Sequence, residues 1–383
     1  MTTDVVVVGG GVIGCAIARH LARTGAGVTV VERARPGEEA SWAAAGMLAP
    51  QVEADGPGPF LDLLLRARKV FPAFAAALGE ETGIDVGYSD VGALSLALTD
   101  ADEEELTMRW VWQTAAGLAV ERLGAEEVLA LEPDVTPDLR WALRFPGDHQ
   151  VDNRELSRAL WTAAEHAGAR FRLGISATGI MRGGGRATGV ELDGGERLEA
   201  GVVVVAAGSW SGGLAGLPRP LPVVPVRGQL LALLMGSQCF RHCVDSPRIY
   251  TVPRGDGRLI VGATVERTGF EKAVTPEGLR MLRAGAAEVA PWTEGLPVLE
   301  SWSGLRPGTP DGLPILGADS EVEALFYATG HYRNGILLAP ATAELIGDAV
   351  LGRGDSTALV PFRIDRFPAS LSRHGGSSPG HRP

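Results

Sequence analysis

The stretch DVVVVGGGVIGCAIARHLARTGAGVTVVE, residues 4 to 32, decides the fold of this chain. It starts with a run of valines typical of a buried parallel strand, followed by a G-x-G-x-x-G turn at Gly9, Gly11 and Gly14 and by a helical stretch. A second apolar run, residues 28 to 31, ends at Glu32, about twenty residues after the glycines. These parts follow one another in the order and at the spacing of a dinucleotide-binding βαβ unit, which we therefore predict for this stretch.

Each part of this unit has a physical task. Gly9 permits the tight turn, Gly11 lets the backbone approach a pyrophosphate, and Gly14 lets the helix lie close to the strand. The helix N-terminus offers free N–H groups and positive potential to the phosphates. The carboxylate of Glu32 can accept hydrogen bonds from both hydroxyls of an adenosine ribose. Its negative charge disfavours a 2′-phosphate, which predicts FAD or NAD and not NADP.

Composition restricts the class of protein. The 383 residues allow two domains, and 45% hydrophobic with 21% charged residues is typical of a soluble protein. A net charge of −11 argues against nucleic-acid binding, and no long apolar stretch predicts a membrane span. The apolar N-terminus is interpreted as a strand and not as a signal peptide, and we expect a cytoplasmic protein. Cys239, His242 and Cys243 have no second Cys/His pair, so no metal site is expected.

The remaining pattern predicts a discontinuous nucleotide domain with an antiparallel domain inserted into it. An acidic run at residues 102–105 is interpreted as a solvated helix end, and Asp152 with Glu155 as a capping box. Helices are expected at residues 61–78, 103–118, 152–168, 275–289 and 340–351, and strands at 169–173, 187–192, 202–206, 248–252, 258–261 and 326–328.

Two arginines lie in turn-rich loops that could carry chemistry. Arg306 belongs to the segment 304–312, and Arg333 to the segment 330–336 that leads into the last helix. A guanidinium is a permanently charged fork suited to a carboxylate, although an arginine in such a loop can equally be structural. A third segment, Tyr250 to Arg254, lies on a strand of the inserted domain.

Seven motifs together resemble a known family. They are GGGVIG (9–14), AAAGMLAP (43–50), YTVPR (250–254), GRLIVGAT (257–264), GLRPGTPDGLPILG (304–317), GHYRNGILLAPAT (330–342) and FRIDR (362–366). The chain resembles the glycine oxidase (ThiO-type) branch of the D-amino acid oxidase and sarcosine oxidase flavoprotein family. The resemblance spans nearly the whole chain up to Arg366.

The resemblance implies an α/β fold, with a discontinuous Rossmann-like FAD-binding domain and an inserted α+β substrate domain built on an antiparallel sheet. The expected limits are 1–84, 149–217 and 304–366 for the FAD-binding domain and 85–148 and 218–303 for the substrate domain, with a disordered tail at 367–383. It also implies a homo-oligomer, with a tetramer suspected.

For the cofactor, the resemblance implies FAD bound non-covalently, since related sarcosine oxidases attach flavin through a cysteine in the loop equivalent to 306–309 and this chain has none there. The nucleotide motif and the resemblance together assign cofactor contacts to Gly9, Gly11, Val12, Ile13, Gly14, Glu32, Arg33, Ser41, Ala45, Gly46, Met47, Ala177, Gly208, His331, Tyr332, Arg333, Asn334, Gly335, Ile336 and Leu337.

The implied reaction is oxidation of glycine, sarcosine or a short D-amino acid by O2, giving an imine or 2-oxo acid, ammonia and H2O2. In the resembling branch the imine can supply thiazole synthesis for thiamine. Arg306 and Tyr250 would bind the substrate carboxylate and Arg333 would line the same pocket. No residue is expected to act as acid or base, and His331 is expected to contact the flavin through its backbone.

Two departures from the family pattern leave the preferred substrate size open: Arg248 replaces a neutral residue, and Val265 stands where a methionine would narrow the pocket. Three alternatives also stay open. The chain could be a dehydrogenase of the same fold that passes electrons to a quinone or carrier, an NAD-dependent dehydrogenase, or a non-catalytic flavin-binding protein.

Overall fold

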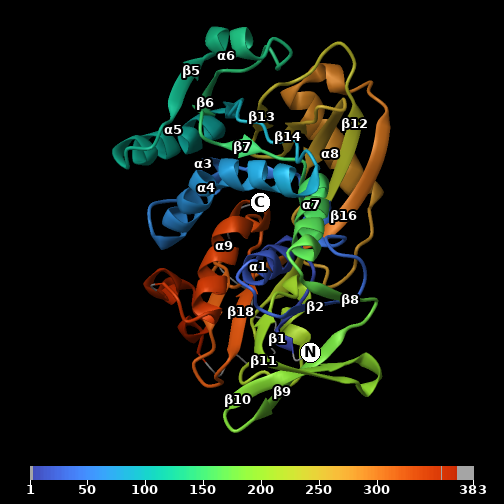
Figure 1. Ribbon diagram of the computed structural model, residues 1–383. Coiled ribbons are helices and arrows are strands. Elements are labelled where there is room, and N and C mark those ends of the chain that lie inside the picture. Colours follow the sequence, from blue (N-terminus) through green and yellow to red (C-terminus); the bar gives the residue numbers. More distant parts are fainter. Residues whose placement is uncertain (1–2, 355, 369–383) are drawn as a thin grey trace.

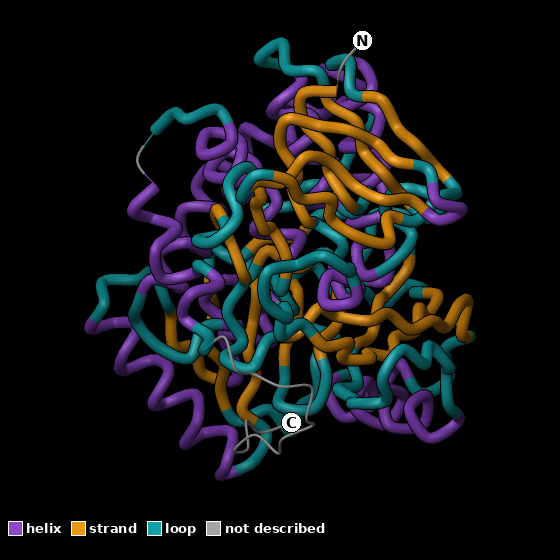
Figure 2. The backbone as a smooth tube through the Cα atoms, turned by 90° about the horizontal axis from the view of Figure 1, so that it is seen from below, coloured by secondary structure: helices purple, strands orange, loops and turns teal. Residues whose placement is uncertain are grey.

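The computed structural model of the chain describes residues 3–354 and 356–368 and contains two large sheets (Figure 1). The first is mainly parallel, and the second is built almost entirely from antiparallel pairs. Viewed from below, the strand group beside the N-terminus has helices running along it (Figure 2). The predicted α/β fold class, with an added antiparallel sheet, is therefore confirmed.

The first sheet has the strand order β17-β18-β11-β1-β2-β8, with the β9–β10 hairpin added beside β11. Val5 and Val7 of β1 pack on one face of this sheet, and Val6 and Val8 on the other. Burial on both faces explains why the strand is a continuous run of valines. The strands are β1 (Thr3–Val8), β2 (Val28–Glu32), β8 (Arg170–Leu173), β9 (Ala177–Gly183), β10 (Arg186–Leu192), β11 (Arg197–Val205), β17 (Ile315–Ala318) and β18 (Leu325–Thr329).

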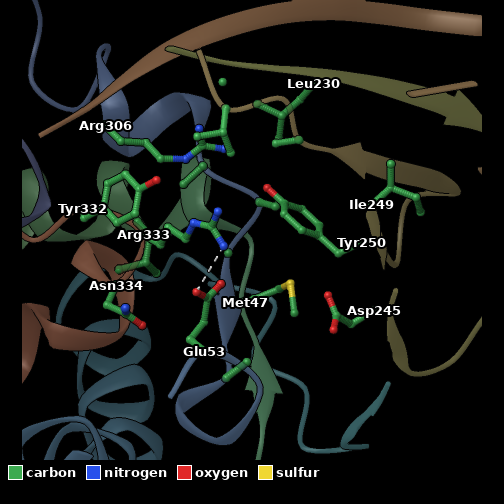
Figure 3. A pocket seen from close by; sticks show the side chains of 18 of the residues that line it. Met47, Glu53, Leu230, Asp245, Ile249, Tyr250, Arg306, Tyr332, Arg333 and Asn334 are labelled. Carbon is green, nitrogen blue, oxygen red and sulfur yellow. Dashed lines mark ion pairs between the residues drawn. The ribbon is translucent and has the colours of Figure 1, made fainter. Parts of the chain in front are cut away.

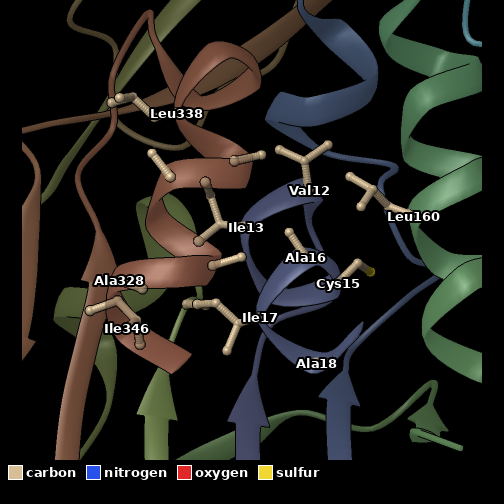
Figure 4. Close-up of a cluster of buried hydrophobic side chains, with 14 of the residues drawn as sticks. Val12, Ile13, Cys15, Ala16, Ile17, Ala18, Leu160, Ala328, Leu338 and Ile346 are labelled. Atoms are coloured by element: carbon tan, nitrogen blue, oxygen red, sulfur yellow. The ribbon is translucent and has the colours of Figure 1, made fainter. Parts of the chain in front are cut away.

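One face of this sheet carries helices α1 (Val12–Ala22), α7 (Asn153–His166) and α9 (Gly335–Val350), and helix α4 (Pro59–Thr82) packs on α7 and α9. Helix α1 lies between α9 and α7: Ile13 and Ile17 point toward Leu338 and Ile346 of α9, while Leu160 of α7 lies beside Val12 (Figure 4). The centre of the core is therefore the apolar surface of α1.

The second sheet has the order β16-β12-β15-β14-β13-β4-β6-β5, and its β13–β4 pair is parallel. Strand β16 continues to Gly308, so the predicted domain boundary at residue 304 falls inside it. The domain limits otherwise stay a prediction. The strands are β4 (Ala93–Ala97), β5 (Glu121–Gly124), β6 (Trp141–Phe145), β12 (Val224–Leu234), β13 (Cys243–Asp245), β14 (Tyr250–Pro253), β15 (Arg258–Gly262) and β16 (Val298–Gly308).

Shorter elements complete the chain. Helices α6 and α8 pack on the face of the second sheet that carries Leu231 and Val261. The remaining elements are α2 (Ala40–Ala43), β3 (Met47–Leu48), α3 (Pro50–Glu53), α5 (Asp100–Ala115), α6 (Ala125–Leu131), β7 (His149–Gln150) and α8 (Pro276–Val289), and the 3₁₀ helices Asp193–Gly195, Gly208–Gly213, Pro291–Thr293, Ser356–Phe362 and Ile364–Arg366.

Two predicted helix starts differ in detail from the structure. Asp152 caps α7 by accepting from the N–H groups of Arg154 and Glu155, but its own N–H donates to the carbonyl of Val86, so the reciprocal bond of a capping box is replaced. In α5 the buried Asp102 is not a solvated helix end. Its side chain accepts from the N–H of Thr99 at 2.8 Å and completes a capping box there.

The last helix starts five residues earlier than the expected 340–351, at Gly335, and Pro340 lies inside it. Proline has no N–H to donate, so an interior proline loses one helix bond, which is why the sequence favoured a start at that residue. The predicted disordered tail began at 367, but Phe367 is buried against the first sheet. Residues 369–383 of that tail lie outside the described residues. Within the described ranges, no helix is both long and apolar enough to cross a membrane.

The contact of α1 with the turn before it depends on Gly14. A Cβ at this position would lie 1.9 Å from the carbonyl oxygen of Gly9. We expect Gly14→Ala to lower the free energy of unfolding by about 1–3 kcal/mol, the usual cost of overpacking, as measured by urea denaturation. Gly56→Ala is the matched control, because a Cβ there meets no atom within 4 Å. Equal stability of the two variants would contradict the close approach.

Candidate active site

A cavity of about 430 Å³ runs along the first sheet from the end of β2 to the start of α9. The N-termini of both α1 and α9 reach it, through Gly11 to Ile13 and through Gly335 and Ile336. The first N–H groups of a helix have no partner within the helix, and the helix dipole adds positive potential there. The first turn of α9, Gly-Ile-Leu-Leu, has no acidic side chain to neutralise that potential. The cavity therefore has two anion-attracting walls.

Glu32 and Ser41 shape the end of the cavity beside α1. One Glu32 carboxylate oxygen accepts from the N–H of Gly10 at 2.7 Å, and the other from the N–H of Ala34 at 2.9 Å. These two bonds fix the carboxylate at the carboxyl end of β2. The Ser41 hydroxyl accepts from the N–H of Val12 at 3.1 Å and so caps α1, whose own N-cap, Gly11, has no side chain. Both side chains lie where a nucleotide on this helix would meet them.

An aromatic residue that the sequence did not single out forms part of the same wall. The guanidinium of Arg33 lies 3.5 Å from the centre of the Trp210 ring and pairs with Glu39. Gly208 and Trp210 belong to the 3₁₀ helix that follows β11, and Arg33, Gly208 and Trp210 all line the cavity. This stack offers a flat surface beside the position of Glu32.

The connection from β18 to α9 separates the long cavity from a smaller one. Tyr332 has φ +49, a left-handed conformation that costs a non-glycine residue about 1–3 kcal/mol. Its N–H donates to the carbonyl of Pro307 at 3.1 Å, which secures this conformation. Burial lowers the pKa of His331 to about 3, and its Nε2 lies 3.1 Å from the hydroxyl of Thr342. His331 is therefore neutral at physiological pH.

The smaller cavity, of about 170 Å³, lies on one face of the second sheet. Glycines on neighbouring strands create its space and support its polar side chains. A Cβ at Gly228 would lie 2.2 Å from Nη1 of Arg306, and one at Gly262 would lie 2.6 Å from the hydroxyl of Tyr250. The side chains of Arg306 and Tyr250 thus lie directly on the backbone of two glycines. Arg306 also donates to the carbonyl of Thr264 at 3.1 Å.

Arg306, Tyr250 and Arg333 point toward the same space (Figure 3). Arg333 forms an ion pair with Glu53 at 3.7 Å. Burial disfavours its charge, but Glu53 and Tyr332 outweigh that effect and raise the pKa of Arg333. Burial also raises the pKa of Tyr250, although Arg306 opposes the shift, so the phenol stays protonated and can donate. Arg306 and Tyr250 together can therefore bind one small carboxylate.

Strand β16 forms a wall shared by the two cavities. Leu305 and Pro307 line the long cavity, while Arg306 between them lines the small one, as expected from the alternation of side chains along a strand. The carbonyl of Leu305 accepts from Ser209 at 2.9 Å. Ala40, Ala44, Tyr332, Arg333 and Ile336 line both cavities, which therefore adjoin each other.

The segment Ala45 to Met47 is fixed by a buried arginine. Arg254 donates to the carbonyls of Ala45 at 2.7 Å and Val151 at 2.8 Å. Gly46 has φ +75, and a Cβ on it would lie 2.0 Å from the carbonyl oxygen of Val151. The YTVPR motif therefore supplies two functions: Tyr250 faces the small cavity, and Arg254 secures the loop beside it.

Most residues predicted for the site line one of the two cavities. The long cavity is lined by Gly9, Gly11, Val12, Ile13, Glu32, Arg33, Ser41, Ala177, Gly208, His331, Tyr332, Arg333, Gly335 and Ile336, and the small one by Ala45, Gly46, Met47, Tyr250, Arg306, Tyr332, Arg333, Asn334 and Ile336. Gly14 and Leu337 line neither cavity, because Gly14 faces the turn at Gly9 and Leu337 is buried in the core around α1. Arg248 lies at the small cavity, but its guanidinium pairs with Glu288.

Sequence reasoning missed Gly228, Gly262, Asp245 and Trp210. The two glycines matter only through strand register, which places them under side chains 78 and 12 residues away in sequence. Asp245 lies directly opposite Tyr250 in the β13–β14 pair. In the sequence, Asp245 follows His242 and Cys243 without belonging to any motif, so nothing there indicates a functional site.

Comparison with known proteins gives a consistent result. The model of a family described as "DAO: FAD dependent oxidoreductase" matches residues 4–349. The chain is 37% identical over 377 residues to the glycine oxidase of Geobacillus kaustophilus, covering 97% of each chain. A crystal structure of that enzyme superposes with a TM-score of 0.90, covering 97% of this chain and 99% of the other.

A second relative is longer than this chain. The bifunctional protein ThiO/ThiG of Trichormus variabilis is 36% identical over 376 residues, which is 97% of this chain and 56% of that protein. The chain thus spans about half the length of the bifunctional relatives. A crystal structure of iminodiacetate oxidase from Chelativorans, 30% identical, has a TM-score of 0.83 and covers 94% of this chain and 98% of that one.

The role of Gly228 in positioning Arg306 can be tested by adding a side chain at residue 228. We expect Gly228→Ala to displace the guanidinium and to weaken the binding of acetate about tenfold or more, the cost of one charge-assisted hydrogen bond, measured by calorimetry. Gly236→Ala, where a Cβ meets nothing within 4 Å, should leave the affinity unchanged. Equal acetate affinity in the two variants would show that Gly228 does not position Arg306.

The buried Asp148 allows a test of stability against pH. Its carboxylate accepts from the N–H groups of Gln51 and Val52, each at 3.0 Å, and so holds the turn that presents Glu53. Burial raises its pKa to about 7 against these hydrogen bonds and the ion pair with Arg68. The folded protein therefore retains a proton that the unfolded chain loses at lower pH, so this group makes folding less favourable as pH rises from about 4 to 7.

Asn cannot ionise at this position but keeps an acceptor oxygen. We expect the unfolding free energy of Asp148→Asn, relative to the unsubstituted protein, to increase by up to about 4 kcal/mol between pH 4 and 7 and then to level off. Urea denaturation at pH 4, 5.5, 7 and 8.5 measures this difference. Two stability curves that run parallel across the range would contradict a raised pKa.

Proposed function

The chain belongs to the DAO family of FAD-dependent oxidoreductases, and on that basis we propose that it is a glycine oxidase-type enzyme that oxidises small amino acids with O2. The observation that carries this proposal is the position of Arg306 and Tyr250. They lie on the bare backbone of Gly228 and Gly262 and converge on a cavity that adjoins the cofactor cavity. The expected products are an imine or 2-oxo acid, ammonia and hydrogen peroxide.

The residues that line the long cavity fit FAD in their chemistry. Glu32 would accept from the ribose hydroxyls, the N-terminus of α1 with Ser41 would meet the pyrophosphate, and Arg33 with Trp210 would lie at the adenosine end. Segments 45–47 and 331–336 would border the ring where the two cavities adjoin. The free N–H groups of α9 would stabilise negative charge that develops at that wall during turnover.

The protein's own task is to orient the substrate. Arg306 and Tyr250 would bind its carboxylate and fix the Cα–H bond toward the cofactor cavity. FAD, when bound, supplies the hydride acceptor and the reaction with O2. His331 stays neutral and bonded to Thr342, and the pKa of Tyr250 is raised, so neither is suited to accept a proton. We therefore propose that the substrate reacts as its neutral amine, without a protein acid or base.

We further propose that FAD binds non-covalently. Among the described residues, no cysteine lines either cavity: Cys15 and Cys243 are buried elsewhere and Cys239 is exposed. The relatives also suggest how the product is used. One is named ThiO/ThiG, and together with the family resemblance this supports the proposal that the product supplies thiamine thiazole synthesis. The family resemblance also supports the proposal that the protein works as a homo-oligomer.

Anaerobic reduction tests the reaction class. Glycine, sarcosine and D-alanine should each bleach the flavin absorbance of the purified protein, and in air each turnover should give one hydrogen peroxide. Bleaching without peroxide would instead favour the dehydrogenase alternative, in which a quinone or carrier accepts the electrons. If none of these amines bleaches the flavin, the proposed function is wrong.

Removing the guanidinium of Arg306 tests the roles assigned to the small cavity. Arg306→Ala should raise KM for glycine about 10- to 100-fold, since a charge-assisted bond contributes about 1.5–3 kcal/mol, while the FAD content stays intact. Arg248→Ala is the matched control: it removes an arginine from the rim of the same cavity whose guanidinium already pairs with Glu288. Steady-state kinetics in which both variants behave alike would remove Arg306 from the substrate site.

A further inference from the structure

The small cavity contains a carboxylate that the proposed reaction does not use. Asp245 lies opposite Tyr250 in the antiparallel β13–β14 pair and beside Ser95 in the parallel β13–β4 pair. Directly opposed residues project their side chains to the same face of a sheet. Asp245 and Tyr250 therefore share the cavity face, and Figure 3 shows the Asp245 carboxylate pointing toward Met47 and the interior of the cavity.

The carboxylate of Asp245 accepts one hydrogen bond, and burial raises its pKa to about 7 although the charges of Arg109 and Arg333 act to lower it. The Ser95 hydroxyl donates to it at 3.0 Å, and among residues 3–354 and 356–368 no ion pair includes Asp245. The arginines nearby are already engaged: Arg248 pairs with Glu288, Arg109 with Glu105, and Arg333 with Glu53. A charge removed from water without a partner is unfavourable, so a cation that enters the cavity would be attracted to Asp245.

The cavity that holds Arg306 and Asp245 also has apolar surface. Met47, Leu230 and Ile249 line it together with the polar side chains of Tyr250, Arg333 and Glu53 (Figure 3). A positive fork, a hydrocarbon lining and a carboxylate make a surface complementary to a molecule with a carboxylate at one end, methylene groups in the middle and an ammonium group at the other end.

From this arrangement we propose that Asp245 is a specificity-determining residue that recognises a second, cationic nitrogen of the substrate. The favoured substrates would be amino acids with an amine-bearing side chain, such as D-lysine or D-ornithine. Their carboxylate binds Arg306 and Tyr250, and their side-chain ammonium pairs with Asp245. This inference rests on the proposed oxidase function and extends its substrate class to amino acids that carry a second amine.

Equilibrium binding to the FAD-loaded protein tests the inference without turnover. Calorimetry compares 4-aminobutanoate, 5-aminopentanoate and 6-aminohexanoate with the alkanoates of equal length. At one length or more, the amino compound should bind at least tenfold more tightly. Asp245→Asn should reduce this advantage below threefold, whereas Ser95→Ala, which keeps the carboxylate, should retain it. No advantage at any length, or an advantage that survives in Asp245→Asn, overturns the inference.

Kinetics separate this inference from the proposed function. The unsubstituted enzyme should show a kcat/KM for D-lysine at least tenfold above that for D-norleucine, which has a similar chain without the ammonium, and Asp245→Asn should remove the difference. If glycine is oxidised but D-lysine and D-norleucine react equally, Asp245 has no such role and the oxidase function stands. If no amine reduces the flavin, the proposed function itself fails. If Asp245→Asn does not fold, the affinities of the unsubstituted enzyme for the same ligand pairs still test the inference.

Discussion

The structure depends on the close approach of α1 to the turn that precedes it. Because Gly14 has no side chain, the helix lies against the carbonyl of Gly9, and its N-terminus reaches the long cavity. Helices α7 and α9 then pack on the two sides of α1 (Figure 4). The position of α1 thereby sets the position of α9, whose N-terminus lies at the far end of the same cavity. The absence of a side chain at Gly14 thus helps to place the N-termini of both α1 and α9 at the same cavity.

The parts of the fold that local sequence predicts well are those whose pattern is contained in a short segment. The βαβ unit at residues 4–32 and the segment before α9 are of this kind, because strand, turn and helix preferences lie within about thirty residues. The substrate face was less predictable. Gly228 and Gly262 gain their role only from the register of strands that are distant in sequence, and Asp245 gains its position from the strand opposite it.

The small differences have local physical causes as well. The capping box predicted at Asp152 is incomplete because Val86, from a distant segment, already accepts the N–H that Glu155 would have bonded. Helix α9 begins before the predicted Pro340, at Gly335, because Ile336 and Leu337 of its first turn are buried in the core around α1. In the first case a tertiary contact replaces a local bond, and in the second the burial of the preceding turn outweighs the helix bond that Pro340 cannot make.

Strand β16 has a consequence for how the enzyme can move. Arg306 faces one cavity, while its neighbours Leu305 and Pro307 line the other and bond to Ser209 and Tyr332. The separation between Arg306 and the long cavity is therefore set by the thickness of a single strand. Any displacement of β16 would change the shape of both cavities at once.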